Sequence, residues 1–229
     1  SLRDVCYSAG ARRAPFEHRL ALAGVTGDVL IGHLDAYLAG APLAGVAAGY
    51  VPRGQRPKLA FVFPGQGGQW AGMGRALLAR APVFRDALAA CDQALRPYLG
   101  QDLLALLADP QAGWLAEIDQ LQPMLFALQV ALAALWQSWG LTPDAVVGHS
   151  LGEIAAAHVA GALSLPDAAR VIGRRSRLLR RVQGQGAMVL VELPADAAVA
   201  AITPVADQVA LAAVNGPRSS VLAGERAAL

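Results

Sequence analysis

The stretch DAVVGHSLGE, residues 144–153, decides the fold of this chain. Its first five residues form a short apolar run that predicts a buried β-strand, and helix-forming residues follow from Leu151. A serine between two glycines at a strand-to-helix junction matches the G-x-S-x-G elbow, whose tight turn exposes the serine at a helix N-terminus. The bare pattern also arises by chance, so the flanking strand and helix carry the interpretation. Ser150 is therefore the candidate nucleophile, and a serine that merely caps the helix is the alternative.

A second apolar run, LAFVF at residues 59–63, predicts another buried strand, and the Gly-rich turn PGQGGQW follows it at residues 64–70. The turn does not fit a dinucleotide site, because Trp70 stands where a third glycine is needed, and it lacks the Gly-Lys-Ser/Thr of a P-loop. Such a turn can instead present the backbone N–H of Gln66 to an oxyanion, with the N–H of Leu151 as the second donor. A plain structural turn is the alternative.

Helical patterns connect and follow these strands. The sequence predicts helices over residues 72–81, 82–95 and 123–139, from residue 151, and up to residue 182 after a capping box at residues 164–167. From residue 187 the pattern changes to strand, helix, strand and strand, over residues 187–193, 195–202, 209–214 and 219–222. These are the first four elements of a split β-α-β unit.

The polar stretch YVPRGQRP at residues 50–57 predicts a linker, so we expect three parts: residues 1–57, 58–186 and 187–229. Two parallel strands are too few for a covered α/β sheet, and the last part lacks a final helix and strand. The chain begins with serine rather than methionine and has no leader pattern. We therefore expect a piece of a longer polypeptide.

Composition excludes several classes of protein. Of 229 residues, 55% are hydrophobic and 16% charged, which is too apolar for a disordered chain, and a net charge of +2 gives no field for nucleic acid. The two cysteines, Cys6 and Cys91, are too few for a disulfide scaffold and lack metal-ligand spacing, which indicates a reducing, cytoplasmic compartment. Residues 120–143 are uncharged, but their glutamines favour a buried helix over a membrane span.

One arginine falls on an apolar helix face. By helical spacing Arg175 lies in the middle of the stripe Ala168, Val171, Ile172, Leu178, Leu179 and Val182. A cation there needs an anion, either a core carboxylate or the carboxylate of a ligand, and spacing alone favours neither. The neighbouring Arg170, Arg174, Arg177 and Arg181 are interpreted as a solvated face. Gln122 either points into the cleft or caps the helix predicted to begin at residue 123.

No base for Ser150 is evident among the four histidines. His149 projects away from its neighbour, and His158 lies about 12 Å along the next helix at 1.5 Å per residue. His18 and His33 belong to the first part of the chain. We therefore expect the base to lie after Leu229.

Four ordered motifs resemble the acyltransferase domain of modular type I polyketide synthases. They are FPGQGGQW at 63–70, QP at 122–123, PDAVVGHSLGE at 143–153 and RRSR at 174–177. Residues 4–7 and 16–20 are similar to the linker that joins the ketosynthase to that domain. The resemblance covers essentially the whole chain.

The resemblance implies a role for each candidate residue. Ser150 is the acylated nucleophile, the amides of Gln66 and Leu151 form the oxyanion hole, and Arg175 clamps the carboxylate of the extender unit. Gln122 lines the pocket, and His149 joins the substrate-binding candidates. The family also needs a histidine well downstream of these motifs, so we expect this fragment alone to be inactive.

The implied fold is α/β: an incomplete α/β-hydrolase-like large subdomain at 58–186, a partial ferredoxin-like small subdomain at 187–229 and a small α+β linker domain at 1–57. The implied partners are an acyl carrier protein domain and the neighbouring ketosynthase. The domain binds no metal or cofactor of its own, and its substrates are a coenzyme A thioester and the phosphopantetheine of the carrier. We expect no nucleic acid and no membrane partner.

The implied reaction is transfer of a malonyl-type unit from coenzyme A to the carrier through an acyl-serine. The segment EIDQLQP at 117–123 is nearer the methylmalonyl pattern, although Gln120 and Leu121 depart from it, and Leu151 is commoner in malonyl-type domains. We expect methylmalonyl over malonyl. The rivals are a serine hydrolase or thioesterase, and a non-catalytic architectural fragment of a megasynthase.

Overall fold

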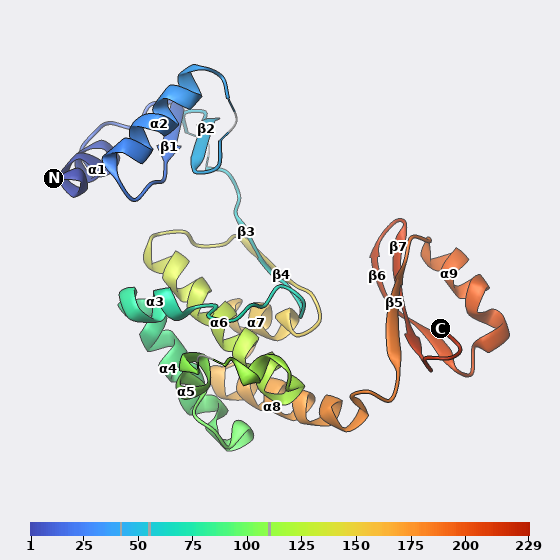
Figure 1. Ribbon diagram of the computed structural model, residues 1–229. Coiled ribbons are helices and arrows are strands. Elements are labelled where there is room, and N and C mark those ends of the chain that lie inside the picture. Colours follow the sequence, from blue (N-terminus) through green and yellow to red (C-terminus); the bar gives the residue numbers. More distant parts are fainter. Residues whose placement is uncertain (42, 55, 110) are drawn as a thin grey trace. The chain divides into compact units, whose positions relative to one another are not determined.

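The computed structural model covers residues 1–229 and describes all of them except residues 42, 55 and 110. Residue 55 belongs to the stretch predicted as a linker and lies outside the described residues. The chain divides into two units, Ser1–Lys58 and Leu59–Leu229, which are described separately (Figure 1). Both mix helices and strands, so the predicted α/β class is confirmed at that level.

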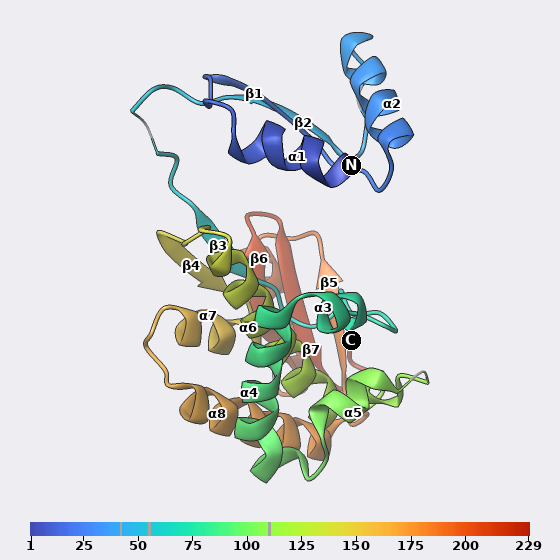
Figure 2. The same ribbon diagram turned by 90° about the vertical axis from the view of Figure 1, so that its left-hand side faces the viewer.

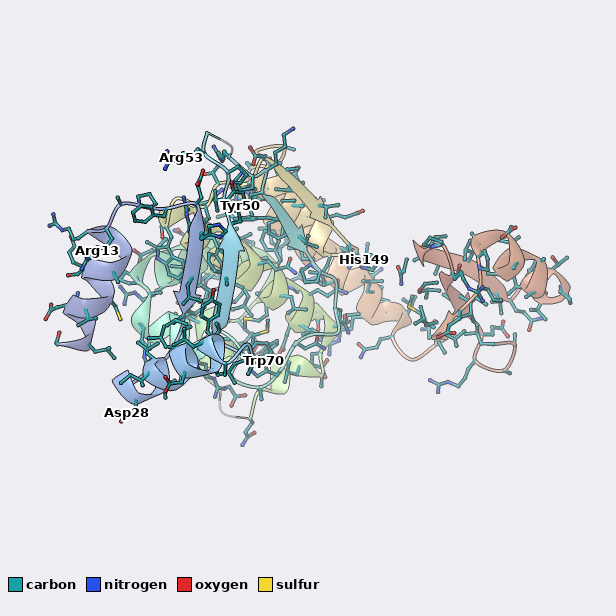
Figure 3. The ribbon with its side chains drawn as sticks, turned by 90° about the horizontal axis from the view of Figure 1, so that it is seen from above. Arg13, Asp28, Tyr50, Arg53, Trp70 and His149 are labelled. Carbon is teal, nitrogen blue, oxygen red and sulfur yellow. The ribbon has the colours of Figure 1, made fainter. Side chains whose placement is uncertain are left out.

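The first unit has two helices and one antiparallel strand pair. Its elements are α1 (Leu2–Ala11), β1 (His18–Leu22), α2 (Gly27–Leu38) and β2 (Val46–Tyr50). Ser1 caps α1 in a capping box with Asp4, as the sequence favours for a serine three residues before an acidic residue. The rings of His18 and Tyr50 lie 5.0 Å apart at one end of this strand pair, with Arg53 just beyond β2 (Figure 3). None of its four elements has a buried residue among those described.

The second unit begins with two parallel strands that are far apart in sequence. Strand β3 (Ala60–Phe63) pairs with β4 (Ala145–Gly148) so that Phe63 lies opposite Gly148. The long crossover between them contains α3 (Arg75–Arg80), α4 (Pro82–Leu99), α5 (Leu103–Ala108), η1 (Gly113–Leu115) and α6 (Ile118–Ser138). Because the strands are parallel, their carboxyl ends meet at one edge, and the segments after both strands lie there.

Helix α6 is the centre of the hydrophobic core. Helix α7 (Gly152–Val159) follows β4, and α4, α6 and α8 (Leu165–Val182) pack side by side (Figure 2). Among the described residues α6 alone is long and apolar enough to cross a membrane, but 67% of its most apolar window is buried inside the chain. That burial is what a core helix requires. It buries Met124, Phe126, Ala127, Leu128 and Ala131.

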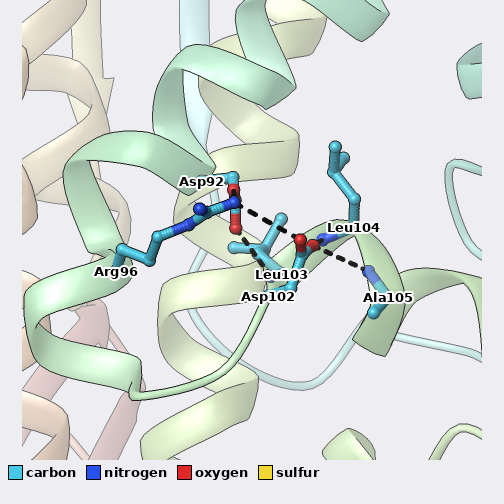
Figure 4. A network of polar contacts seen from close by, with 6 residues as sticks. All are labelled: Asp92, Arg96, Asp102, Leu103, Leu104 and Ala105. Carbon is cyan, nitrogen blue, oxygen red and sulfur yellow. Dashed lines mark hydrogen bonds and ion pairs between the residues drawn. The ribbon is translucent and has the colours of Figure 1, made fainter.

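A buried carboxylate fixes the start of α5 (Figure 4). Asp92 on α4 is 4% exposed and accepts hydrogen bonds from the Leu103 N–H at 2.7 Å and from Arg96 at 2.9 Å. Asp102 caps the same helix by accepting from the N–H groups of Leu104 and Ala105. A buried charge is tolerated only when its oxygens are bonded in this way.

The last part of the unit is a three-stranded antiparallel sheet with one helix. Its elements are β5 (Ala187–Val191), α9 (Ala195–Ile202), η2 (Thr203–Val205), β6 (Val209–Gly216) and β7 (Ser219–Gly224), with strand order β5-β7-β6. Ala198, Val209 and Leu222 form its small core. The order strand, helix, strand, strand agrees with the predicted sequence of elements.

Helix α6 begins earlier than the sequence indicates. It starts at Ile118, so Gln122 and Pro123 lie inside it and the interpretation of Gln122 as a helix cap is wrong. A proline inside a helix costs about 3 kcal/mol because it lacks the N–H and crowds the preceding turn. Here Pro123 is buried, and the burial of most of α6 offsets that cost.

The predicted apolar stripe of α8 is wrong in part. Ala168 and Ile172 are buried, but Val171, Leu178 and Val182 are 42%, 57% and 55% exposed. The buried face consists of the small residues Ala168, Ala169, Gly173 and Ser176 with Ile172. A Cβ on Gly173 would lie 2.5 Å from Tyr98 Cβ, so α8 approaches α4 closely. Small side chains therefore define the packed face.

Candidate active site

Ser150 lies in a strained turn between β4 and α7. Its φ is +54°, in the left-handed region that non-glycine residues seldom occupy. The flanking positions have no room for a side chain. A Cβ on Gly148 would lie 2.4 Å from Glu153 Cα, and a Cβ on Gly152 would lie 2.0 Å from the Phe63 oxygen. Ser150 is exposed, and α7 begins two residues later. The predicted strand, elbow and helix are therefore present, but the prediction that residues 59–63 and 144–148 form buried strands is wrong, since Val62 is 69% and Val147 is 57% exposed in this two-stranded sheet.

The Gly-rich turn after β3 packs directly against the elbow. The His149 N–H donates to the Phe63 carbonyl at 2.9 Å. A Cβ on Gly65 would lie 3.0 Å from His149 Nδ1 and 3.4 Å from Ser150 Cβ. Among the described residues no hydrogen-bond acceptor takes the backbone N–H of Gln66 or Leu151. Both N–H groups, one in the adjoining turn and one in the residue after Ser150, are therefore available as donors.

A guanidinium lies beside the serine hydroxyl. Arg175 Nη2 donates to Ser150 Oγ at 3.2 Å, and its Nη1 donates to the amide oxygen of Gln122. Gln122 is 4% exposed, and its Nε2 lies 3.5 Å from Gln66 Oε1. The structure thus joins α8, α6, the elbow and the Gly-rich turn through four of the predicted residues.

The guanidinium of Arg175 has no carboxylate partner in the described part of the chain. Acidic groups pair with other arginines of α8, Asp167 with Arg170, and Glu117 and Asp119 with Arg180. The hydrogen bond from Arg180 to Asp119 and the negative charges of Asp119 and Glu117 stabilise the guanidinium cation. They therefore raise the pKa of Arg180 above its ordinary value. The core carboxylate considered as the partner of Arg175 is therefore not found among these residues.

The histidines take structural contacts. His149 Nε2 lies 3.2 Å from the side-chain oxygen of Asn215 on β6, and His158 Nδ1 lies 3.0 Å from the Leu163 carbonyl. His149, at the end of β4 (Figure 3), therefore faces Asn215 rather than Ser150. Among the described residues no histidine hydrogen-bonds Ser150 Oγ.

Burial removes one other nucleophile from consideration. Cys91 is buried in the core, and desolvation raises the pKa of its thiol to about 12. The reactive thiolate is therefore scarce at neutral pH. Within the described residues no three histidine, cysteine or acidic side chains are placed to hold a metal ion.

Two residues of the site were not among the sequence candidates. Asn215 follows the strand predicted over residues 209–214, and in the structure it lies within β6. Gln129 donates from Nε2 to the Pro64 carbonyl at 2.7 Å, at the start of the Gly-rich turn. Gln129 is seven residues after Gln122, two helical turns on the same face. That spacing was a signal available in the sequence.

Comparison with known proteins places this geometry in a family. Residues 60–229 match the family described as "Acyl transferase domain". The chain is 47% identical over 235 residues to polyketide synthase GfsE of Streptomyces halstedii, covering 100% of this chain and 6% of that protein.

Solved structures of acyltransferases resemble this chain in fold as well as in sequence. The acyltransferase domain from module 8 of the salinomycin polyketide synthase has a TM-score of 0.89 and 43% identity over 99% of this chain and 53% of that one. A malonyl-transacylase in complex with its type II carrier protein, PlMCAT:AntF, has a TM-score of 0.66 and 35% identity over 75% and 56% of the two chains. The chain spans about half the length of these solved proteins. It belongs to the acyltransferase-domain family of modular type I polyketide synthases.

Proposed function

We propose that Ser150 accepts a carboxylated acyl unit from a coenzyme A thioester and passes it to the phosphopantetheine thiol of an acyl carrier protein domain. The observation that carries the proposal is the contact between Arg175 and Ser150, in which a cation that has no carboxylate partner among the described residues lies beside a strained and exposed hydroxyl. A guanidinium in that place can hold a carboxylate through paired N–H donors while the thioester carbon faces the serine.

The transfer takes two balanced displacements. Ser150 Oγ bonds to the thioester carbon, the carbon–sulfur bond breaks, and coenzyme A leaves as the thiol with the serine proton. The carrier thiol then attacks the ester, the acyl–oxygen bond breaks, and Ser150 regains its proton. In both steps the N–H groups of Gln66 and Leu151 stabilise the tetrahedral oxyanion. The acyl group therefore moves from the thiol of coenzyme A to Ser150, and from Ser150 to the thiol of the carrier.

A general base must take the proton from Ser150 in the first step. None of the described histidines contacts the hydroxyl, and this chain spans 53% of the solved domain from salinomycin module 8. We therefore place the base in a part of the domain outside these residues, and we expect this chain alone to form little acyl-enzyme.

The acyl unit is of the malonyl type, and methylmalonyl is our choice over malonyl. The segment at residues 117–123 supports this choice through its sequence pattern, and it ends at Gln122 and Pro123 inside α6. Gln122 contacts Arg175, so the segment adjoins the proposed carboxylate site. We keep His149 in the substrate-binding group because it precedes Ser150 in the elbow, although its ring contacts Asn215.

The surrounding assembly is inferred from the same family. We assign residues 1–57 to the linker from a ketosynthase, residues 58–186 to a hydrolase-like large subdomain and residues 187–229 to a ferredoxin-like small subdomain. The carrier domain and the ketosynthase are the protein partners, and the compartment is the cytoplasm. The PlMCAT:AntF complex supports the carrier as partner, since a relative of 35% identity binds one.

The decisive experiment is covalent labelling of the complete acyltransferase domain that contains this chain. Labelled malonyl-, methylmalonyl- and acetyl-coenzyme A are mixed with it, and the Ser150 peptide is analysed by mass spectrometry. The proposal requires a malonyl-type ester on Ser150 that transfers to added carrier protein faster than it hydrolyses. Equal labelling by acetyl, or release to water instead of the carrier, would establish the hydrolase or thioesterase. Absence of any label would leave the architectural fragment.

A further inference from the structure

One face of α6 contacts the Gly-rich turn at two points. Gln122 and Gln129 are seven residues apart, which places their side chains within about 20° of one another and about 10 Å apart along the helix. Gln122 reaches the side chain of Gln66, and Gln129 reaches the backbone carbonyl of Pro64 at 2.7 Å. The rigid helix therefore spans the turn that carries the proposed oxyanion donor.

The Pro64 carbonyl is confined and receives a donor only from Gln129 among the described residues. A Cβ on Gly152 would lie 2.7 Å from this oxygen, so the first turn of α7 leaves no room for it to move toward the elbow. The Pro64–Gly65 peptide plane is thus held between α6 and the elbow. That plane is one residue before the peptide that carries the Gln66 N–H.

Gly65 makes such an anchor necessary. A Cβ at this position would lie 3.0 Å from His149 Nδ1, a tight contact that glycine avoids. Glycine leaves its two backbone dihedral angles poorly restricted, and these angles aim the Gln66 N–H. On the far side the turn is closed by Gln69, whose Oε1 accepts from the Gly67 N–H at 2.8 Å. The Gln129 bond restrains the near side.

We propose that Gln129 is a positioning residue for acyl transfer: its bond to the Pro64 carbonyl fixes the direction of the Gln66 N–H toward the oxyanion. This inference rests on the proposed function. It differs from the role of Gln122, which contacts side chains of the carboxylate site, because Gln129 acts only on the backbone that precedes the donor. Gln129 should therefore affect the transition state and leave ground-state binding of the thioester unchanged.

The test compares Gln129→Met with Gln137→Met in the complete acyltransferase domain. Methionine keeps an unbranched side chain of similar length and removes the donor, and Gln137 is an exposed glutamine on the same helix. Single-turnover acylation of Ser150 is measured across a range of extender thioester concentrations, and rates are normalised to the cooperatively folded fraction. Gln129→Leu is measured in the same way as a second variant without a donor.

We expect both Gln129 variants to lower the maximal acylation rate about 10- to 100-fold with the half-saturating concentration unchanged, because oxyanion donors act in the transition state. Gln137→Met should match the parent domain. A rate within twofold of the parent, or a loss that appears as a raised half-saturating concentration, would overturn the positioning role. If the parent domain itself forms no acyl-Ser150, the proposed function fails, which is a different result.

Discussion

Arg175 Nη2 lies 3.2 Å from Ser150 Oγ and donates a hydrogen bond to it, although Arg175 lies on α8 and Ser150 lies in the turn between β4 and α7. Gln122 holds the other end of the same guanidinium. The proposed nucleophile and the proposed carboxylate clamp are therefore preorganised against each other before any substrate binds.

Replacing Arg175 by alanine should change selectivity more than overall reactivity. Loss of a hydrogen bond to a charged group costs about 2 kcal/mol, or roughly 30-fold in kcat/KM for a malonyl-type thioester. Acetyl-coenzyme A has no carboxylate and should lose far less. Steady-state transfer to the carrier protein by the complete domain measures both, with Arg174→Ala, an exposed neighbour, as the control. An unchanged ratio of the two substrates would contradict the carboxylate role of Arg175.

The strained backbone at position 150 predicts that a glycine there is more stable than an alanine. Ser150→Ala and Ser150→Gly both remove the hydroxyl, but only glycine adopts a φ of +54° without steric cost. We expect Ser150→Gly to exceed Ser150→Ala by about 1 kcal/mol in the free energy of unfolding. Urea denaturation of both variants tests this. Equal stabilities would show that the turn stores no strain.

Substitution of Gly152 by alanine should prevent normal packing of the elbow. The added Cβ would lie 2.0 Å from the oxygen of Phe63, and Phe63 is held in place by the parallel pairing of β3 with β4. We expect a loss of about 3 kcal/mol or more in unfolding free energy. Gly68→Ala is the matched control, since nothing lies within 4 Å of a Cβ there. Comparable thermal unfolding of the two variants would contradict the close approach of strand and elbow.

The buried carboxylate of Asp92 should matter for stability. Asp92→Ala leaves the Leu103 N–H without an acceptor and should cost about 2 kcal/mol of unfolding free energy. Asp92→Asn keeps an acceptor oxygen and should cost less. Asp86→Ala, at an exposed position of the same helix, should be nearly neutral. Denaturant titration measures the unfolding free energies of the three variants. An Asp92→Ala variant as stable as the parent would refute a stabilising role for the hydrogen bond from the Leu103 N–H.

The two cysteines should differ in reactivity. Cys91 is buried with the pKa of its thiol raised to about 12, whereas Cys6 is exposed. At pH 8 a thiol reagent should therefore titrate one group in the native chain and two in denaturant. Burial favours the neutral thiol, so this stabilisation is present below pH 9 and is lost as the pH rises toward 12. Cys6→Ser should leave no rapidly reacting native thiol.

The local elements were predictable because their signals are local. The strand run and glycines of residues 144–153 predict the elbow from sequence, and Ser164 with Asp167 predicts the start of α8. The start of α6 was not predictable in this way, because Pro123 normally indicates a helix boundary and burial overrode it. The stripe of α8 was misassigned because small residues, rather than large ones, allow the close approach to α4.

The sequence alone determined which chemical groups are present and which of them lie at element ends: Ser150 in its elbow, the Gln66 turn after β3, and the order of strand, helix, strand and strand after residue 186. Only the tertiary structure decided that Arg175, Gln122 and Gln129 converge on those ends. Their convergence depends on the parallel pairing of β3 with β4, which are separated by an 81-residue crossover, and on the close packing of α4, α6 and α8. Contacts between residues so far apart depend on how whole helices pack, which no local spacing encodes.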